Sequence, residues 1–290
     1  MCLETSVGAL KMKNPLMLAS GILDMTRRSM ERFSDAGAVV TKSLGMEERK
    51  GYGNPSVVEL EHGILNAMGL PNPGVDQYLK EIEGIRIENV IGSIFGKDDR
   101  EFSEVAEKVG GAVKAVEMNM SCPHAGGYGA DFPTNKIREA VRAVKKSVDV
   151  PVFVKLGSEN IIERAGEAEA GGADAIVAIN TVRAMAIDVE TGMPVLANRV
   201  GGYSGPAIKP IGVRCVYELA GKVDVPIIGV GGITTAYDVL EYMMAGASAV
   251  QIGSGIHYRG EGIFKEICIE LREWLKAHGY KRIVDVAGTD

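Results

Sequence analysis

Short apolar segments alternate with longer amphipathic segments along almost the whole chain, and this alternation limits the fold more than any other feature. Strand-length apolar runs occupy residues 15–19, 38–41, 89–94, 114–119, 152–156, 175–180, 226–230 and 249–252. Helical periodicity occupies residues 27–36, 74–84, 100–109, 137–147, 161–171, 211–221 and 236–245. Eight strands with intervening helices in about 250 residues predict an α/β fold, a closed (β/α)8 TIM barrel, with an open doubly wound sheet as the alternative.

The ends of the barrel and the domain organisation can also be predicted. Residues 5–13 predict a short N-terminal β-hairpin that caps the bottom of the barrel, and we expect insertions at the C-terminal face. No linker or low-complexity stretch divides the 290 residues, so we expect one domain over residues 1–290.

Composition and charge exclude several classes of protein. The chain is 46% hydrophobic and 24% charged, and its net charge of −6 gives no indication of a nucleic-acid partner. Its four cysteines are far apart and form no Cys-x-x-Cys pair, so we expect neither disulfides nor a metal site. No apolar run reaches membrane-spanning length and the first ten residues lack a signal-peptide pattern, so we expect a cytoplasmic protein.

Residues 116–123, with the sequence Val-Glu-Met-Asn-Met-Ser-Cys-Pro, predict a strand that brings Asn119 and then Cys122 to its C-terminal end. Pro123 ends the strand, and the glycine-rich stretch after it predicts a mobile loop. An amide and a thiol under a flexible loop indicate a reaction site under a lid. A buried structural thiol is the alternative for Cys122.

Lysines and glycines stand at the ends of the other predicted strands, where such barrels carry their chemistry. Gly231, Gly232 and Gly253 would let backbone N–H groups approach an anion, which favours a bound phosphate over ordinary turns. Lys155 would point inward and need a negative partner. A reduced flavin could be that partner, and a Schiff-base lysine of an aldolase is the alternative. A barrel that only binds a phosphorylated ligand is a further alternative.

Taken together, these motifs resemble class 1 dihydroorotate dehydrogenases, most closely the B subtype. The matching segments are residues 14–21, 40–43, 65–74, 119–123, 154–156, 179–181, 194–198, 204–210 and 229–233. They follow one another in the order expected for the family, from about residue 14 to about residue 255.

The resemblance implies an FMN enzyme that oxidises dihydroorotate to orotate in pyrimidine biosynthesis. Cys122 would be the base that removes the C5 proton, while hydride passes from C6 to N5 of FMN. By this resemblance the cofactor would contact Ala19, Ser20, Lys42, Ser43, Asn119, Lys155, Ile179, Gly205, Gly231, Gly232, Gly253 and Ser254. The substrate would contact Lys42, Asn66, Met68, Gly69, Leu70, Asn119, Asn180 and Thr181.

Two departures from the family pattern matter. His124 follows the Cys-Pro pair where the family usually has Asn, and residues 22–25 lack the usual aromatic side chain. Cys-Pro-His also occurs in the pyrimidine-reducing domain of dihydropyrimidine dehydrogenase, so a pyrimidine reductase of that type is an alternative.

The resemblance to the B subtype also implies a partner. We expect a homodimeric core in a heterotetramer with an electron-transfer subunit that carries FAD and a [2Fe–2S] cluster and reduces NAD⁺. The A-subtype alternative is a homodimer that uses fumarate.

Overall fold

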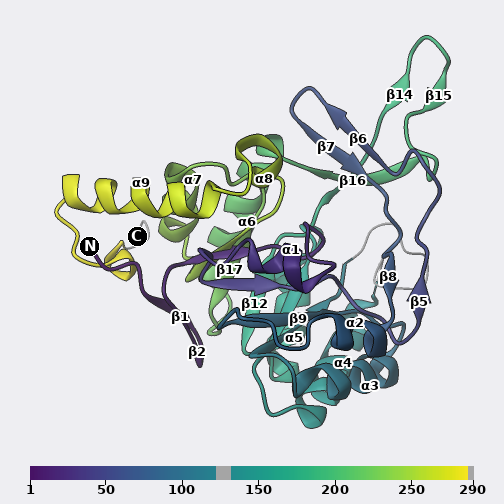
Figure 1. The fold of residues 1–290 in the computed structure, drawn as a ribbon, viewed down its shortest axis with the longest axis horizontal. Coiled ribbons are helices and arrows are strands. Elements are labelled where there is room, and N and C mark those ends of the chain that lie inside the picture. Colours follow the sequence, from purple (N-terminus) through teal and green to yellow (C-terminus); the bar gives the residue numbers. More distant parts are fainter. Residues whose placement is uncertain (122–131, 287–290) are drawn as a thin grey trace.

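The computed structural model describes residues 1–121 and 132–286 of the chain. Cys122, Pro123 and His124 lie outside the described residues, as does the loop predicted after them. Eight parallel strands form a closed barrel in the order β10-β11-β12-β17-β18-β3-β4-β9 (Figure 1). The predicted TIM barrel is therefore confirmed, and the open doubly wound sheet is excluded.

All eight barrel strands lie within the predicted apolar runs. They are β3 (Leu16–Leu18), β4 (Ala38–Val40), β9 (Val90–Ile94), β10 (Ala115–Asn119), β11 (Val152–Leu156), β12 (Ala175–Ala178), β17 (Ile227–Val230) and β18 (Ala249–Ile252). Buried parallel strands carry apolar residues on both faces, which is why continuous apolar runs identified them.

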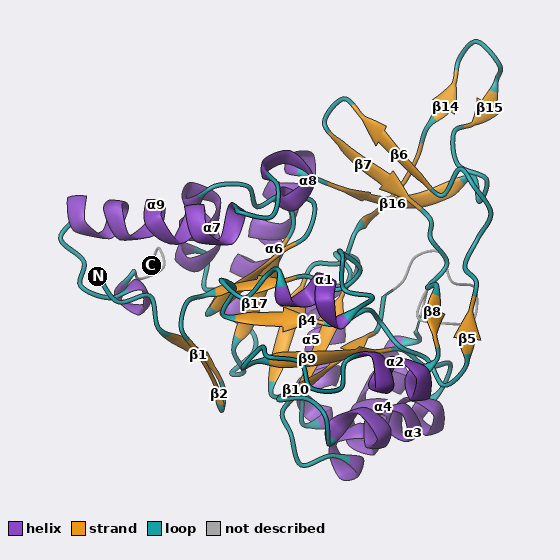
Figure 2. Ribbon diagram, viewed as in Figure 1, coloured by secondary structure: helices purple, strands orange, loops and turns teal. Residues whose placement is uncertain are grey.

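Helices follow most of the strands and surround the barrel (Figure 2). They are α1 (Arg27–Glu31), α2 (Val75–Glu81), α3 (Asp99–Gly110), α4 (Thr134–Ser147), α5 (Ile161–Gly171), α6 (Lys209–Ala220), α7 (Ala236–Met244), α8 (Gly255–Arg259) and α9 (Ile263–Ala277), with 3-10 turns η1 (Pro206–Ile208) and η2 (Ile283–Asp285). Thr26, Asp98 and Thr235 accept backbone hydrogen bonds as N-caps of α1, α3 and α7. Helix α1 ends five residues before the predicted boundary, because Ser34 and Asp35 are poor interior helix residues.

A hairpin of β1 (Thr5–Val7) and β2 (Leu10–Met12) fills the bottom of the barrel, as predicted. Its inward side chains Val7, Leu10 and Met12 belong to one buried cluster with barrel-interior residues such as Phe153. The Thr5 hydroxyl donates a hydrogen bond of 3.0 Å to the carbonyl of Ser248, just before β18. The hairpin therefore excludes water from the lower end of the barrel.

Insertions after β4 and β12 build additional strands at the opposite end of the barrel. Strands β13 (Val182–Met185), β16 (Val200–Ser204), β7 (Gly63–Asn66) and β6 (Val57–Leu60) form an antiparallel sheet in that order. Two short pairs accompany it, β14 (Ile187–Asp188) with β15 (Met193–Pro194) and β5 (Glu48–Arg49) with β8 (Asn72–Pro73). Figure 1 shows the β14–β15 pair as the part that projects farthest from the barrel.

Within residues 1–121 and 132–286, no helix combines the length and the apolar character needed to cross a lipid bilayer.

Candidate functional site

A cavity of about 450 Å³ opens at the C-terminal ends of the barrel strands. The barrel contributes strand-end side chains to its wall, and the antiparallel sheet contributes Val57, Ile64, Asn66 and Ser204 from the other side. Apolar walls with a few convergent polar groups are typical of small-molecule sites of this volume.

The cavity brings together almost all of the predicted site residues that the structure describes. Its wall includes Ala19, Ser20, Lys42, Ser43, Asn66, Met68, Gly69, Leu70, Asn119, Lys155, Ile179, Asn180, Thr181, Gly231, Gly232, Gly253 and Ser254. Catalytic candidate Cys122 lies outside the described residues.

Gly205 is the described candidate that does not line the cavity. It follows Ser204 at the end of β16 with φ of 112°, a conformation that favours glycine. A Cβ at this position would lie 2.7 Å from the Cα of Gly63. Gly205 therefore permits a close approach of two backbone segments behind the cavity wall.

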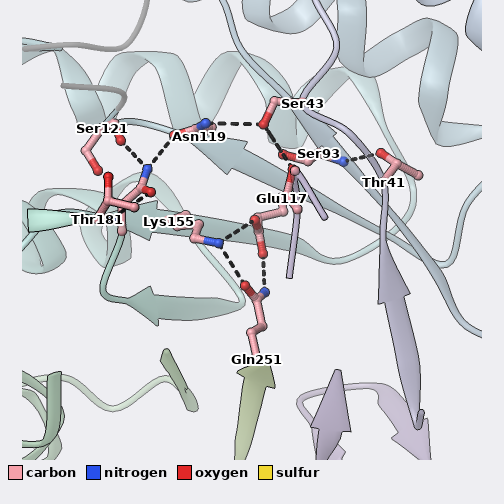
Figure 3. A network of polar contacts seen from close by, with 12 residues as sticks. Thr41, Ser43, Ser93, Glu117, Asn119, Ser121, Lys155, Thr181 and Gln251 are labelled. Atoms are coloured by element: carbon pink, nitrogen blue, oxygen red, sulfur yellow. Dashed lines mark hydrogen bonds and ion pairs between the residues drawn. The ribbon is translucent and has the colours of Figure 1, made fainter. Parts of the chain in front are cut away.

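Two asparagines take part in a hydrogen-bonded chain in the cavity wall, Asn119 at the end of β10 and Asn180 two residues after β12. Figure 3 shows Asn119, Ser43 and Ser93 of this chain. The Asn180 amide donates to Asn119 Oδ1 at 3.2 Å and also to the carbonyl of Ser121. Asn119 Nδ2 in turn donates to Ser43 Oγ at 3.2 Å, and Ser43 Oγ lies 2.8 Å from Ser93 Oγ. Since each amide is held by neighbours, both have fixed donor and acceptor directions before a ligand enters.

Lys155 rises from β11 into the cavity floor and is held from below by two residues that sequence analysis missed. Its ammonium donates to Gln251 Oε1 at 2.8 Å and lies 3.7 Å from Glu117 Oε1. Gln251 Nε2 donates to Glu117 Oε2 at 2.5 Å. Glu117 is therefore the negative partner that an inward-pointing Lys155 requires.

Lys42, at the end of β4, stands near a second buried carboxyl group, that of Asp24. The Asp24 side chain is 1% exposed and accepts a hydrogen bond of 2.5 Å from the Gly21 N–H. Burial raises the pKa of Asp24 to about 6, although the nearby Lys42 ammonium and backbone donors oppose this shift. The Lys42 side chain lines the cavity, with its ammonium beside Gly21. It is therefore available to an anionic ligand.

Glycines form the part of the wall above β17 and β18. Gly231 and Gly232 have φ of 127° and 70°, and a Cβ on Gly232 would lie 2.7 Å from the Cβ of Lys209. The bare backbone of Gly231, Gly232 and Gly253 thus faces the cavity. Backbone N–H groups and two lysines can donate hydrogen bonds to anionic groups, and the apolar walls can pack against a ring. The site therefore fits a flat cofactor with a phosphate, such as FMN.

Comparisons with known proteins agree with this geometry. The family model for dihydroorotate dehydrogenase matches residues 2–275. The dihydroorotate dehydrogenase B (NAD(+)), catalytic subunit, of Methanocaldococcus jannaschii is 52% identical over 286 residues, which cover 94% of each chain. The protein of the same name from Pyrococcus abyssi is 49% identical over 294 residues, covering 99% of this chain and 98% of the relative.

A solved structure shows the same fold at much lower sequence identity. The crystal structure of DHODH in complex with ferulenol from Eimeria tenella matches with a TM-score of 0.85 and 21% identity, covering 98% of this chain and 87% of that chain. The extent of the family match and the identity to the two archaeal relatives lead to one conclusion: the chain belongs to the dihydroorotate dehydrogenase family.

Proposed function

We propose that this chain is the FMN-binding catalytic subunit of an NAD⁺-linked dihydroorotate dehydrogenase, which oxidises dihydroorotate to orotate in pyrimidine biosynthesis. The observation that carries the proposal is the cavity at the barrel mouth, where two lysines and two oriented asparagines converge. Relatives at about 50% identity over the full chain, each named as the catalytic subunit of the B-type enzyme, support it.

The residues proposed to hold FMN divide by chemistry. Backbone groups of Gly231, Gly232, Gly253 and Ser254 would bind its phosphate, with Gly205 keeping the adjoining loops close. Side chains and backbone at the other strand ends would contact the ring, namely Ala19, Ser20, Lys42, Ser43, Asn119, Lys155 and Ile179. When bound, FMN supplies the acceptor for the hydride that leaves C6 of dihydroorotate.

The substrate presents a carboxylate and an imide edge, which need cationic and amide partners. Lys42 can pair with the carboxylate, while Asn66, Asn119 and Asn180 can satisfy the imide edge. The Thr181 N–H donates to Asn180 Oδ1 at 2.9 Å and thereby fixes that amide. Met68, Gly69 and Leu70 complete the wall on the side of the antiparallel sheet. A ligand that left these cavity amides unpaired would bind poorly.

Cys122 is proposed as the base that takes the C5 proton. The assignment rests on the Asn-Met-Ser-Cys-Pro motif, since the residue lies outside the described part of the structure. The thiolate is the competent form, and a free cysteine is mostly thiol at neutral pH. We therefore expect the rate to rise with pH until the thiol is ionised.

The proposal includes a partner for reoxidation. The relatives' designation as catalytic subunits supports the presence of a partner subunit. We propose that this partner carries FAD and a [2Fe–2S] cluster and joins a homodimeric core of this chain in a cytoplasmic heterotetramer. Purified chain, with and without this partner, should be assayed with NAD⁺ and with fumarate. Turnover with fumarate by the chain alone would indicate the A-subtype alternative.

The decisive experiment is anaerobic addition of dihydroorotate to the FMN-loaded chain, followed by visible absorbance. We expect the flavin absorbance to bleach and orotate to form. Dihydrouracil serves as the control, because bleaching by dihydrouracil alone would favour the dihydropyrimidine dehydrogenase-like alternative. No bleaching by dihydroorotate in a folded, FMN-loaded protein would contradict the proposal.

A further inference from the structure

Three polar side chains meet inside the barrel directly below the cavity. Glu117 comes from β10, Lys155 from β11 and Gln251 from β18, and Figure 3 shows the three heads pointing toward one another. Glu117 and Gln251 are fully buried, and neither lines the cavity, whereas Lys155 does. Any influence of Glu117 on a bound ligand must therefore act through Lys155 or through the electric field.

The connections within this group are unequal. Gln251 bridges the two charges, because it accepts from Lys155 at 2.8 Å and donates to Glu117 at 2.5 Å. The direct separation of Lys155 Nζ and Glu117 Oε1 is 3.7 Å, too long for a hydrogen bond. Glu117 Oε1 has no hydrogen-bond partner at all among the described residues.

An incompletely paired buried carboxylate is costly, so its presence calls for a reason beyond packing. Its position supplies one: a negative charge this close to Lys155 reduces the positive potential that the lysine presents to the cavity. The amide bridge meanwhile prevents the ammonium from collapsing onto the carboxylate and holds it at the cavity floor.

We propose that Glu117 is a positioning residue that acts through Lys155 and sets how strongly the cavity favours reduced over oxidised FMN. This inference rests on the proposed function, since it concerns the same bound cofactor. Reduced FMN carries more negative charge on its ring than oxidised FMN, so it responds more strongly to the potential at the floor.

The first test is Glu117→Gln, which removes the charge but keeps the shape and a possible hydrogen bond to Gln251. With the opposing charge gone, Lys155 should favour reduced FMN about tenfold more strongly. For a two-electron couple this ratio is a positive shift of about 30 mV in the midpoint potential. The potential is measured by anaerobic spectroscopic titration of bound FMN against a reference dye, without substrate turnover.

The second test is Gln251→Met, which removes the bridge while conserving side-chain length. Lys155 and Glu117 can then approach each other directly, so the midpoint potential should shift in the negative direction. Opposite signs for these two substitutions are not expected from general loosening of the barrel.

Glu167→Gln is the matched control. Glu167 forms a 2.8 Å ion pair with Arg138 between α4 and α5, away from the cavity. It undergoes the same change in charge, and we expect the potential of bound FMN to stay unchanged.

The outcomes separate this inference from the proposed function. An unchanged or more negative potential in Glu117→Gln would overturn the role of Glu117, even if the wild-type chain binds FMN and is bleached by dihydroorotate. If that variant does not fold, the sign of the shift in Gln251→Met decides. Failure of both variants to fold would make the group a structural requirement and would equally overturn the inference. A wild-type chain that takes up no FMN would instead remove the proposed function.

Discussion

The two ends of the barrel interior differ in chemistry although they are built from the same strands. On the inward face of β10, Ala115 is followed by Glu117 and then Asn119. On β11 the inward residues change from Phe153 to Lys155, and Ala249 of β18 gives way to Gln251 in the same manner. Alternate residues of a strand share a face and are about 7 Å apart, so the interior changes from apolar to polar within one or two such steps.

This difference separates stability from chemistry along each strand. The lower end is closed by the hairpin side chains Val7, Leu10 and Met12. These side chains are apolar, so their burial requires no hydrogen-bond partners. The upper end buries polar groups that each need a hydrogen bond. Among the described residues, two buried side-chain oxygens lack a hydrogen bond, Glu117 Oε1 and Ser121 Oγ, and both lie at this upper end. The comparison predicts that substitutions at the two ends affect different quantities.

The largest effect is expected for Cys122→Ala, at the residue three positions after the end of β10 in the sequence. Loss of a general base should slow flavin reduction by dihydroorotate by about 10³-fold, while the affinities for FMN and orotate and the melting temperature change little. Stopped-flow measurement of flavin bleaching tests this. Cys215→Ala, which removes a buried thiol on α6, is the control and should keep its rate. Near-wild-type bleaching by Cys122→Ala would remove this residue from its proposed role.

Met12→Ala should show the opposite pattern at the lower end. Truncating this buried plug residue leaves a cavity, so the free energy of unfolding should fall by about 3 to 4 kcal/mol. Chemical denaturation measures this loss, and the affinity for orotate should be unchanged. Lys11→Ala, an exposed neighbour on β2, should change stability by less than about 0.5 kcal/mol. A large loss of orotate affinity in Met12→Ala would show that the two ends are coupled.

Asp24→Asn tests the cost of a buried carboxyl group at the upper end. Burial raises the pKa of Asp24 from 3.8 to about 6, so the folded state holds the proton more tightly than the unfolded state. The stabilisation from this group is complete below about pH 4 and is lost as the pH rises through about 6. As the pH rises from about 4 to above 6, the free energy of unfolding of the variant should increase by about 2 to 3 kcal/mol relative to that of wild type. Urea denaturation of both proteins across this range measures the gain, and parallel pH profiles would contradict the assignment.

The smallest of these effects is expected for Asn180→Ala. The substitution removes the amide that Asn180 would offer to orotate and the 3.2 Å donor that orients Asn119 Oδ1. We expect the binding free energy of orotate to weaken by about 1 to 2 kcal/mol, which is roughly tenfold in affinity. Asn198→Ala is the control, because it also removes a side-chain hydrogen bond to a carbonyl but lies outside the cavity wall. Equal losses of affinity in the two variants would argue against a specific role for Asn180.

The barrel could be predicted from sequence because each buried strand is a separate short apolar run. The antiparallel sheet above it could not. Its strands are partly exposed, and β16 pairs with β7 through Gly202 and Asn66, which are far apart in the chain. Neither a continuous apolar run nor a local turn signal marks such strands.

Most of the described site residues could be placed at the cavity because they lie at strand ends. Glu117 and Gln251 were missed, although Glu117 stands two residues before Asn119 and hence on the same face of β10. That period-two relation was the available signal. For Asp24 there was none, because its burial depends on the turn at Gly21 and on Tyr78, whose hydroxyl donates to the Asp24 carbonyl.

Ring closure in this molecule joins the earliest and the latest strands of the barrel. The Val250 N–H donates to the carbonyl of Pro15 at 2.9 Å, and β18 pairs with β3 along its length. During synthesis, β3 can pair with β4 early, but its pairing with β18 requires that residues 249–252 have been translated. Until then, neither the pairing of β3 with β18 nor the hydrogen bond from Thr5 to Ser248 can form. The lower end of the barrel and the cavity at its upper end are consequently both completed late in synthesis, because each includes residues at or next to β18.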